Sequence, residues 1–170
     1  MNPHGKLGLA LITGLGACQT GSTAPAIGAN IINVQGQSIG RAMVTRTAKG
    51  VKIKVQVSGL ATGRHGIHIH AVGRCTPPDF MSAGPHFNPD SLQHGSGSAA
   101  GKHAGDLPNL EVDRSGKADQ TFEVEGLTLD PGPRSLLSPR NLSLVIHADP
   151  DDEITDPSGK SGARIACAAF

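Results

Sequence analysis

The chain has 170 residues, the length of one ordinary domain, and its charges nearly cancel, with 15 Lys and Arg against 14 Asp and Glu. This balance excludes a protein held on nucleic acid by a basic surface and a chain kept disordered by an acidic tract. With 23 Gly and 12 Pro but four Phe and no Tyr or Trp, the composition favours short strands and turns over a helical bundle. Eight histidines remain to be explained.

The N-terminus has the features of an export signal. A short, positively charged start is followed by an apolar stretch, residues 7–15, that is too short for an ordinary transmembrane helix. Residues 15–18, Leu-Gly-Ala-Cys, resemble a bacterial lipobox, in which the Cys is lipidated and becomes the first mature residue. We predict a lipoprotein-type signal peptide over residues 1–17, lipidation of Cys18, and an exported, periplasmic protein anchored in the bacterial cell envelope.

A second cleavage site competes with the first. Residues 24–26, Ala-Pro-Ala, fit the small-residue rule, and cleavage there would discard Cys18. Residues 18–29 are rich in Ser, Thr, Gly, Ala and Pro and are predicted to form a flexible tether. The folded domain is then expected over residues 30–170.

The remaining cysteines fit an exported protein. Without Cys18, two of three cysteines are left, Cys75 and Cys167. In an oxidising compartment they most simply form one disulfide, and two buried free thiols are the alternative. Such a bridge closes a loop of about ninety residues and stabilises the fold by about 4 kcal/mol in the chain-entropy model.

Along the mature chain, strand-like runs recur between turn signals. In residues 51–57, Val and Ile alternate with Lys and Gln, which places apolar and polar side chains on opposite faces of a strand. Two stretches, residues 73–107 and 148–163, resist strand assignment, and long loops of this kind are commonly functional. We predict an all-β antiparallel sandwich or barrel of eight strands with two long functional loops. The predicted strands are residues 31–34, 41–47, 51–57, 65–72, 110–113, 118–124, 142–148 and 164–168.

Histidines collect at the ends of these strands. His68 and His70 are two residues apart, so both imidazoles lie on one face of an extended strand and can reach a common ion. The same alternation turns His147 outward from the core. His65 is an odd number of residues from His68 and is predicted to point inward, where it makes a structural hydrogen bond.

The first long loop carries further potential ligands. Three imidazoles and a carboxylate match tetrahedral zinc, and imidazoles from two strands match a tetragonal copper site. The alternative is a solvated polar loop with scattered histidines. The loop residues concerned are His86, His94, His103 and Asp106.

Six segments in this order resemble the copper,zinc superoxide dismutases of bacteria, over roughly residues 30–170. The resemblance implies an eight-stranded antiparallel Greek-key barrel that converts superoxide to dioxygen and hydrogen peroxide with one copper and one zinc per chain. The segments are Gly63-Arg64-His65-Gly66-Ile67-His68-Ile69-His70, residues 83–89, His94-Gly95, Gly105-Asp106-Leu107, residues 143–147 and residues 162–167.

The resemblance also implies the metal ligands. His86 belongs to both sets and bridges the metals as an imidazolate, because both ring nitrogens must lose their protons to bind two cations. The implied copper ligands are His68, His70, His86 and His147, and the implied zinc ligands are His86, His94, His103 and Asp106.

Further roles follow from the same resemblance. Asp151 accepts hydrogen bonds from His68 and His94 and fixes both rings, with an exposed loop carboxylate as the alternative. Cys75 and Cys167 form the disulfide of the family.

The implied catalytic residues are Arg164 and His86. Arg164 attracts and binds the small superoxide anion, and His86 returns a proton to the departing peroxide. The alternative for Arg164 is a surface arginine in an ion pair. Lys160 is a candidate for steering the anion, but its loop also carries acidic residues, among them Asp151, Asp152, Glu153 and Asp156, so the sign of the field stays open.

The expected partners are superoxide and the two metals, with no nucleic acid and with membrane contact only through a lipid on Cys18. A homodimer is compatible with the resemblance, although the short loop before Arg164 leaves its interface undefined.

Two rival functions remain. A copper-carrying or copper-buffering envelope lipoprotein on the same fold would be favoured by loss of a copper ligand or of Arg164, and neither is lost. A structural zinc domain would leave the strand histidines without a role, and the cysteines lack paired C-x-x-C spacing.

Overall fold

The computed structural model describes residues 26–99, 101–137 and 141–170, together with Met1. The predicted signal peptide, the lipidation site Cys18 and the tether up to residue 25 lie outside the described residues. Within the described part, the secondary structure consists of nine strands and one short 3-10 turn, Met81–Ala83. No helix in that part is long and apolar enough to cross a membrane.

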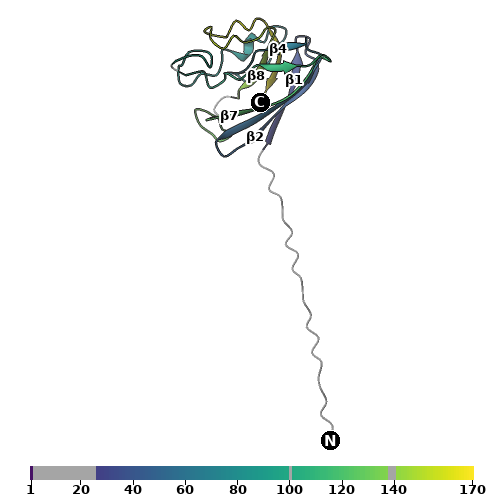
Figure 1. The fold of residues 1–170 in the computed structure, drawn as a ribbon, viewed down its shortest axis with the longest axis vertical. Coiled ribbons are helices and arrows are strands. Elements are labelled where there is room, and N and C mark those ends of the chain that lie inside the picture. Colours follow the sequence, from purple (N-terminus) through teal and green to yellow (C-terminus); the bar gives the residue numbers. More distant parts are fainter. Residues whose placement is uncertain (2–25, 100, 138–140) are drawn as a thin grey trace.

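The strands form a curled antiparallel sheet with a small second sheet (Figure 1). The large sheet has the order β5-β8-β9-β1-β2-β3-β7, and β4 pairs with β6. Figure 1 shows the long loops gathered at one end of the curled sheet. The predicted all-β antiparallel fold with long loops is thereby confirmed. The strands are β1 (Ala26–Asn33), β2 (Ser38–Arg46), β3 (Gly50–Ser58), β4 (Gly63–His65), β5 (Ile67–His70), β6 (Leu110–Val112), β7 (Lys117–Glu125), β8 (Ser143–His147) and β9 (Arg164–Ala169).

One predicted strand is divided in two. The run over residues 65–72 breaks at Gly66, so that β4 pairs with β6 while β5 pairs with β8. The Gly66 N–H donates to the Asp149 carbonyl at 2.8 Å, and its carbonyl accepts from the His147 N–H at 2.8 Å. A Cβ at Gly66 would lie 2.7 Å from the Cβ of Ser161, so only glycine fits where the chain passes between sheets.

The first strand begins earlier than predicted. β1 starts at Ala26, which pairs with Thr45 of β2, rather than at Ile31. Residues 26–29 of the expected tether are therefore part of the sheet. Three of these four residues are Ala or Gly, which resembles a linker in composition, but pairing with β2 decides their conformation instead.

The core lies inside the curled sheet and follows the predicted alternation. In β3 every second side chain is buried, from Val51 to Val57, whereas Lys54 and Gln56 are exposed. Ile67 and Ile69 of β5 and Leu144 and Ile146 of β8 also enter this core. The histidines of β5 therefore face away from it, toward the loops.

A side chain closes the gap between β6 and β7. The Gln120 amide nitrogen donates to the Asn109 carbonyl at 3.2 Å, and its amide oxygen accepts from the Glu111 N–H at 2.9 Å. These bonds link the end of the first long loop to the barrel wall.

Candidate metal centre

Four imidazoles from two strands and one loop form the first group of potential ligands. Their ligand atoms all lie within 4.8 Å of one another, and the four residues are between 0 and 7% exposed. One nitrogen of each ring is buried without a hydrogen-bond partner, namely Nδ1 of His68 and Nε2 of His70, His86 and His147. A single unpaired buried polar atom is unfavourable by about 1–3 kcal/mol, so four that converge are best explained by a bound cation.

Hydrogen bonds hold the opposite nitrogens of these rings. His68 Nε2 lies 2.7 Å from Asp151 Oδ2, and His70 Nδ1 lies 2.8 Å from the Gly84 carbonyl. A ring nitrogen that donates to an oxygen fixes the tautomer and leaves the other nitrogen free as a ligand.

The second group surrounds one carboxylate oxygen. Asp106 Oδ1 lies 2.9 Å from His86 Nδ1, 3.1 Å from His94 Nδ1 and 3.3 Å from His103 Nδ1. Its other oxygen accepts from the backbone N–H groups of Gly95 at 3.0 Å and His103 at 3.1 Å. All four residues are buried. Because His86 presents one nitrogen to each group, it joins the two.

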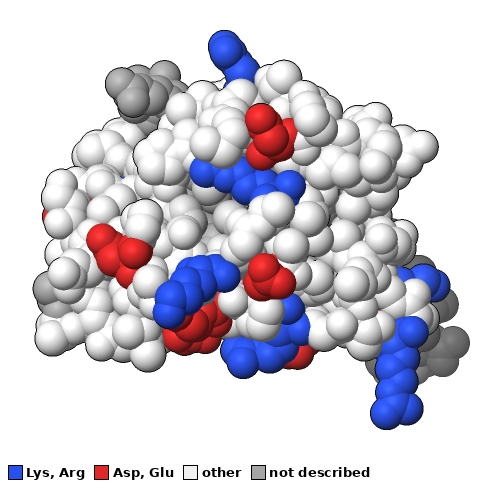
Figure 2. Space-filling model, turned by 90° about the horizontal axis from the view of Figure 1, so that it is seen from above, with Lys and Arg blue, Asp and Glu red and all other residues white. Residues whose placement is uncertain are grey.

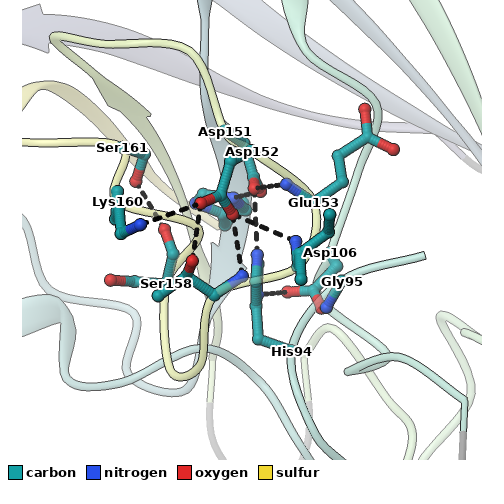
Figure 3. A network of polar contacts seen from close by, with 12 residues as sticks. His94, Gly95, Asp106, Asp151, Asp152, Glu153, Ser158, Lys160 and Ser161 are labelled. Atoms are coloured by element: carbon teal, nitrogen blue, oxygen red, sulfur yellow. Dashed lines mark hydrogen bonds and ion pairs between the residues drawn. The ribbon is translucent and has the colours of Figure 1, made fainter. Parts of the chain in front are cut away.

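Asp151 bonds to one ring of each group, and Figure 3 shows its carboxylate directed toward the His94 ring. Its Oδ1 is 3.0 Å from His94 Nε2, and its Oδ2 is the partner of His68. The side chain is buried rather than exposed on the loop, and the Glu153 N–H also donates to it at 2.6 Å. The structure thus brings Asp151 to the position expected for a residue that orients one ring of each group.

Asn109 is a residue of this network that sequence reasoning missed. Its amide oxygen accepts from the Asp151 N–H at 2.7 Å, and its amide nitrogen donates to the Asp151 carbonyl at 3.0 Å. Asn109 is buried and follows Asp106 by three residues, but its partner is 42 residues away along the chain. No local pattern signals that contact.

Arg164 lies beside the first group. Its guanidinium donates to the carbonyls of Phe80 and Gly84, both at 2.9 Å. The Gly84 oxygen also accepts from His70, so the arginine and a potential ligand share one anchor. Burial lowers the pKa of Arg164 and Asp79 opposes this effect. Among the described residues, no carboxylate forms an ion pair with it.

The predicted disulfide is confirmed, since Cys75 and Cys167 are bonded with a Cα–Cα distance of 5.7 Å. It ties the start of the first long loop to β9, three residues beyond Arg164.

His65 lies outside both groups. It bonds to the carbonyls of His147 at 2.8 Å and Ala61 at 2.9 Å, as the predicted structural role requires.

Burial and neighbouring carboxylates shift the pKa of four of these histidines in different directions. Burial lowers the pKa of three histidines of the first group, to about 2 for His70, about 4 for His86 and about 3 for His147. Burial also acts to lower the pKa of His94, but the Asp106 and Asp151 carboxylates beside its two ring nitrogens raise it to about 9. At neutral pH these three imidazoles are therefore neutral and can bind a cation, whereas His94 must first lose a proton.

Charges of both signs are interspersed over the face seen in Figure 2, and most of that face is uncharged. Lys160 Nζ lies 3.8 Å from Asp152 Oδ2, so its charge is partly offset within its own loop. No extended field of one sign covers this face.

The fold and the paired groups define a class of protein: an all-β metalloprotein with two adjacent sites joined by one imidazole. Comparison with known proteins gives the family. The sequence profile described as "Copper/zinc superoxide dismutase (SODC)" matches residues 20–170, and the chain belongs to this family.

Relatives and solved structures agree with this assignment. The chain is 43% identical over 141 residues to "Superoxide dismutase [Cu-Zn] 1" of Aquifex aeolicus, covering 82% of this chain and 83% of that protein. The crystal structure of a SOD-like protein from Bacillus subtilis superposes with a TM-score of 0.81 at 36% identity, covering 84% and 96%. Cu/Zn superoxide dismutase from Brucella abortus gives a TM-score of 0.68 at 25% identity, covering 85% and 99%.

Proposed function

We propose that this protein dismutates superoxide, so that two superoxide anions and two protons give one dioxygen and one hydrogen peroxide. The observation that carries the proposal is the convergence of six buried, unpaired imidazole nitrogens on two positions that share His86. The family to which the chain belongs supports the same reaction.

The donor sets fit two different metals. Four nitrogens, Nδ1 of His68 and Nε2 of His70, His86 and His147, would hold copper, and three nitrogens with Asp106 Oδ1 would hold zinc through His86, His94 and His103. When bound, copper supplies one-electron redox chemistry, whereas zinc has no redox chemistry and orders the loop.

The chain's own residues bind the anion and move the proton. Arg164 is held by two carbonyls, so its charge and remaining N–H groups are fixed beside the first group, where they attract and orient a small anion. His86 keeps Nδ1 toward the zinc group, and its Nε2 can hold a proton and give it to the departing peroxide.

The test is dismutation measured together with metal content. We expect one copper and one zinc per chain and rapid superoxide removal in the loaded protein, and loss of both copper and activity in His147→Ala. Stoichiometric copper without activity above that of free copper ions would contradict the proposal and favour the copper-carrying alternative.

We further propose that the protein is exported and anchored through a lipid on Cys18. The Cys75–Cys167 disulfide supports an oxidising compartment. The wild-type protein should partition into a detergent phase with the membranes, and Cys18→Ser should be released in the aqueous phase. Equal partitioning of both would contradict lipidation.

A further inference from the structure

A cavity beside the zinc group is the starting point. Its volume is about 460 Å³, and the wall includes His86, His103, Phe87, Leu92, Asp156 and Pro157. Two of these residues belong to the proposed zinc ligands and are themselves almost fully buried. The cavity therefore connects the second group with the surface.

Asp156 stands where the cavity meets solvent. Its side chain is 57% exposed, and its Oδ1 lies 3.9 Å from His103 Nε2, the ring nitrogen opposite the proposed zinc ligand atom. The same oxygen accepts the His94 N–H at 2.7 Å. No Lys or Arg among the described residues pairs with Asp156, so its negative charge stays available to a cation.

A second cavity also reaches His103 but has a different charge environment. It measures about 410 Å³ and is lined by Lys102 and Arg134. The Lys102 ammonium donates to the Asp106 carbonyl at 2.7 Å, close to the zinc group. The acidic side chains of this cavity each pair with a cation: Asp90 with Arg134, Glu123 with Lys52 and Glu125 with Lys49. A dication is therefore drawn to the first cavity rather than the second.

From this geometry we infer that zinc enters its site through the cavity at Asp156, and that the Asp156 carboxylate captures the incoming cation and passes it to His103 and His86. The inference rests on the proposed zinc site. Carboxylate oxygen is an acceptable zinc ligand, so an exposed Asp can hold the ion briefly before the buried imidazoles replace it. Asp156 thus acts on the rate of loading and is not one of the four final ligands.

The experiment uses cobalt(II) as a coloured substitute for zinc. The full chain, freed of metals by a chelator with its disulfide intact, is mixed with cobalt(II), and the visible absorption of the tetrahedral ion is followed by stopped flow. In Asp156→Asn the amide oxygen still accepts the His94 N–H, but the charge is gone. We expect association about three to ten times slower at 10 mM ionic strength, and a weaker dependence on salt than in the wild type.

Two variants serve as controls. Glu153→Gln removes the same charge from the same loop, but its side chain contacts Ser96 and lies outside the cavity wall. It should load at the wild-type rate, as should Asp156→Glu, which keeps the charge. Dissociation into excess chelator should slow by a similar factor in Asp156→Asn, because a group that leaves the bound site unchanged acts equally on entry and exit.

Loading of Asp156→Asn at the wild-type rate, or equal slowing in Glu153→Gln, would overturn the inference while leaving the zinc site intact. The zinc site is tested separately by the end point. Failure of the wild type to take up one cobalt per chain, or unchanged uptake in His103→Ala, would overturn the site and the entry route together.

Discussion

Gly159 allows the loop after β8 to close over the metal centre, and replacing it with alanine tests that role. Its φ is +63°, and a Cβ there would lie 1.7 Å from Asp151 Oδ1 and 2.7 Å from His94 Nε2. The backbone cannot easily retreat, because the Gly159 N–H donates to Thr155 at 2.6 Å and its carbonyl accepts from Asp152 at 2.9 Å. In Gly159→Ala the Asp151 carboxylate must therefore move by more than an ångström.

The magnitude follows from the contacts that this movement breaks. The left-handed backbone disfavours alanine by about 1–2 kcal/mol. Loss of the bonds from Asp151 to His68 and His94, each about 1.5–3 kcal/mol because a charge is involved, brings the total to about 4–8 kcal/mol. Because Asp151 orients a ring of each group, zinc affinity should also fall by about 10–100-fold.

Gly59→Ala is the matched control. Gly59 has a φ of +81°, but a Cβ there would meet no atom within 4 Å. This variant should lose only the 1–2 kcal/mol of the backbone term and keep its zinc affinity. Stability is measured by guanidinium unfolding followed by circular dichroism, and zinc affinity by competition with a chromophoric chelator. If Gly159→Ala matches Gly59→Ala in both measurements, the Asp151 carboxylate is not confined by residue 159.

Three further predictions concern the anion site, the disulfide and pH. Arg164→Ala should keep its copper but lose about 10–100-fold in activity, which corresponds to the loss of one charge-assisted hydrogen bond. Pulse radiolysis measures the rate, and an unchanged rate would exclude Arg164 from anion binding. Replacing Cys75 and Cys167 together with serine should lower the unfolding free energy of the metal-free protein by about 4 kcal/mol, and a loss below about 1 kcal/mol would contradict the loop-closure argument. Stability of the metal-free protein should fall as the pH drops from about 6 to 4.5, by up to about 4 kcal/mol per unit, because three buried histidines with lowered pKa stay neutral in the fold and bind protons once unfolded. The stability of the metal-free protein should also fall as the pH rises from about 6.5 through 9, because the raised pKa of His94 adds stability only while its proton is bound. Guanidinium unfolding measured across this pH range tests both slopes, and a stability that does not change with pH would refute them.

Local alternation explains why part of the site could be predicted from the sequence. Strand geometry sends successive side chains to opposite faces, so His68 and His70 had to share the face opposite Ile67 and Ile69 once a strand formed. The structure follows that pattern in β5 and β8. The prediction that His65 stays out of both groups is also correct. It assumed one continuous strand through residues 65–70, however, and the structure divides that strand at Gly66.

Contacts between the two long loops could not be predicted in this way. Asn109 holds Asp151 across 42 residues, and Asp156 holds the backbone of His94 across 62 residues. The break at Gly66 likewise depends on Ser161, from the second loop. Each contact depends on where distant segments lie in the fold, and the periodicity of a short stretch of sequence carries no information about such contacts.

The loop over residues 148–163 is best understood as the outer half of the zinc group, although all four proposed zinc ligands come from the other long loop. Its Asp151 bonds to the His94 ring, its Asp156 bonds to the His94 backbone, and Gly159 packs against both Asp151 and the same ring. Because His94 is held at three points from one loop, and Asp151 also bonds to His68, disturbing that loop must change both metal groups at once. Zinc loss and altered copper binding should therefore appear together in loop variants, and a variant that changes one metal alone must act on the ligands themselves.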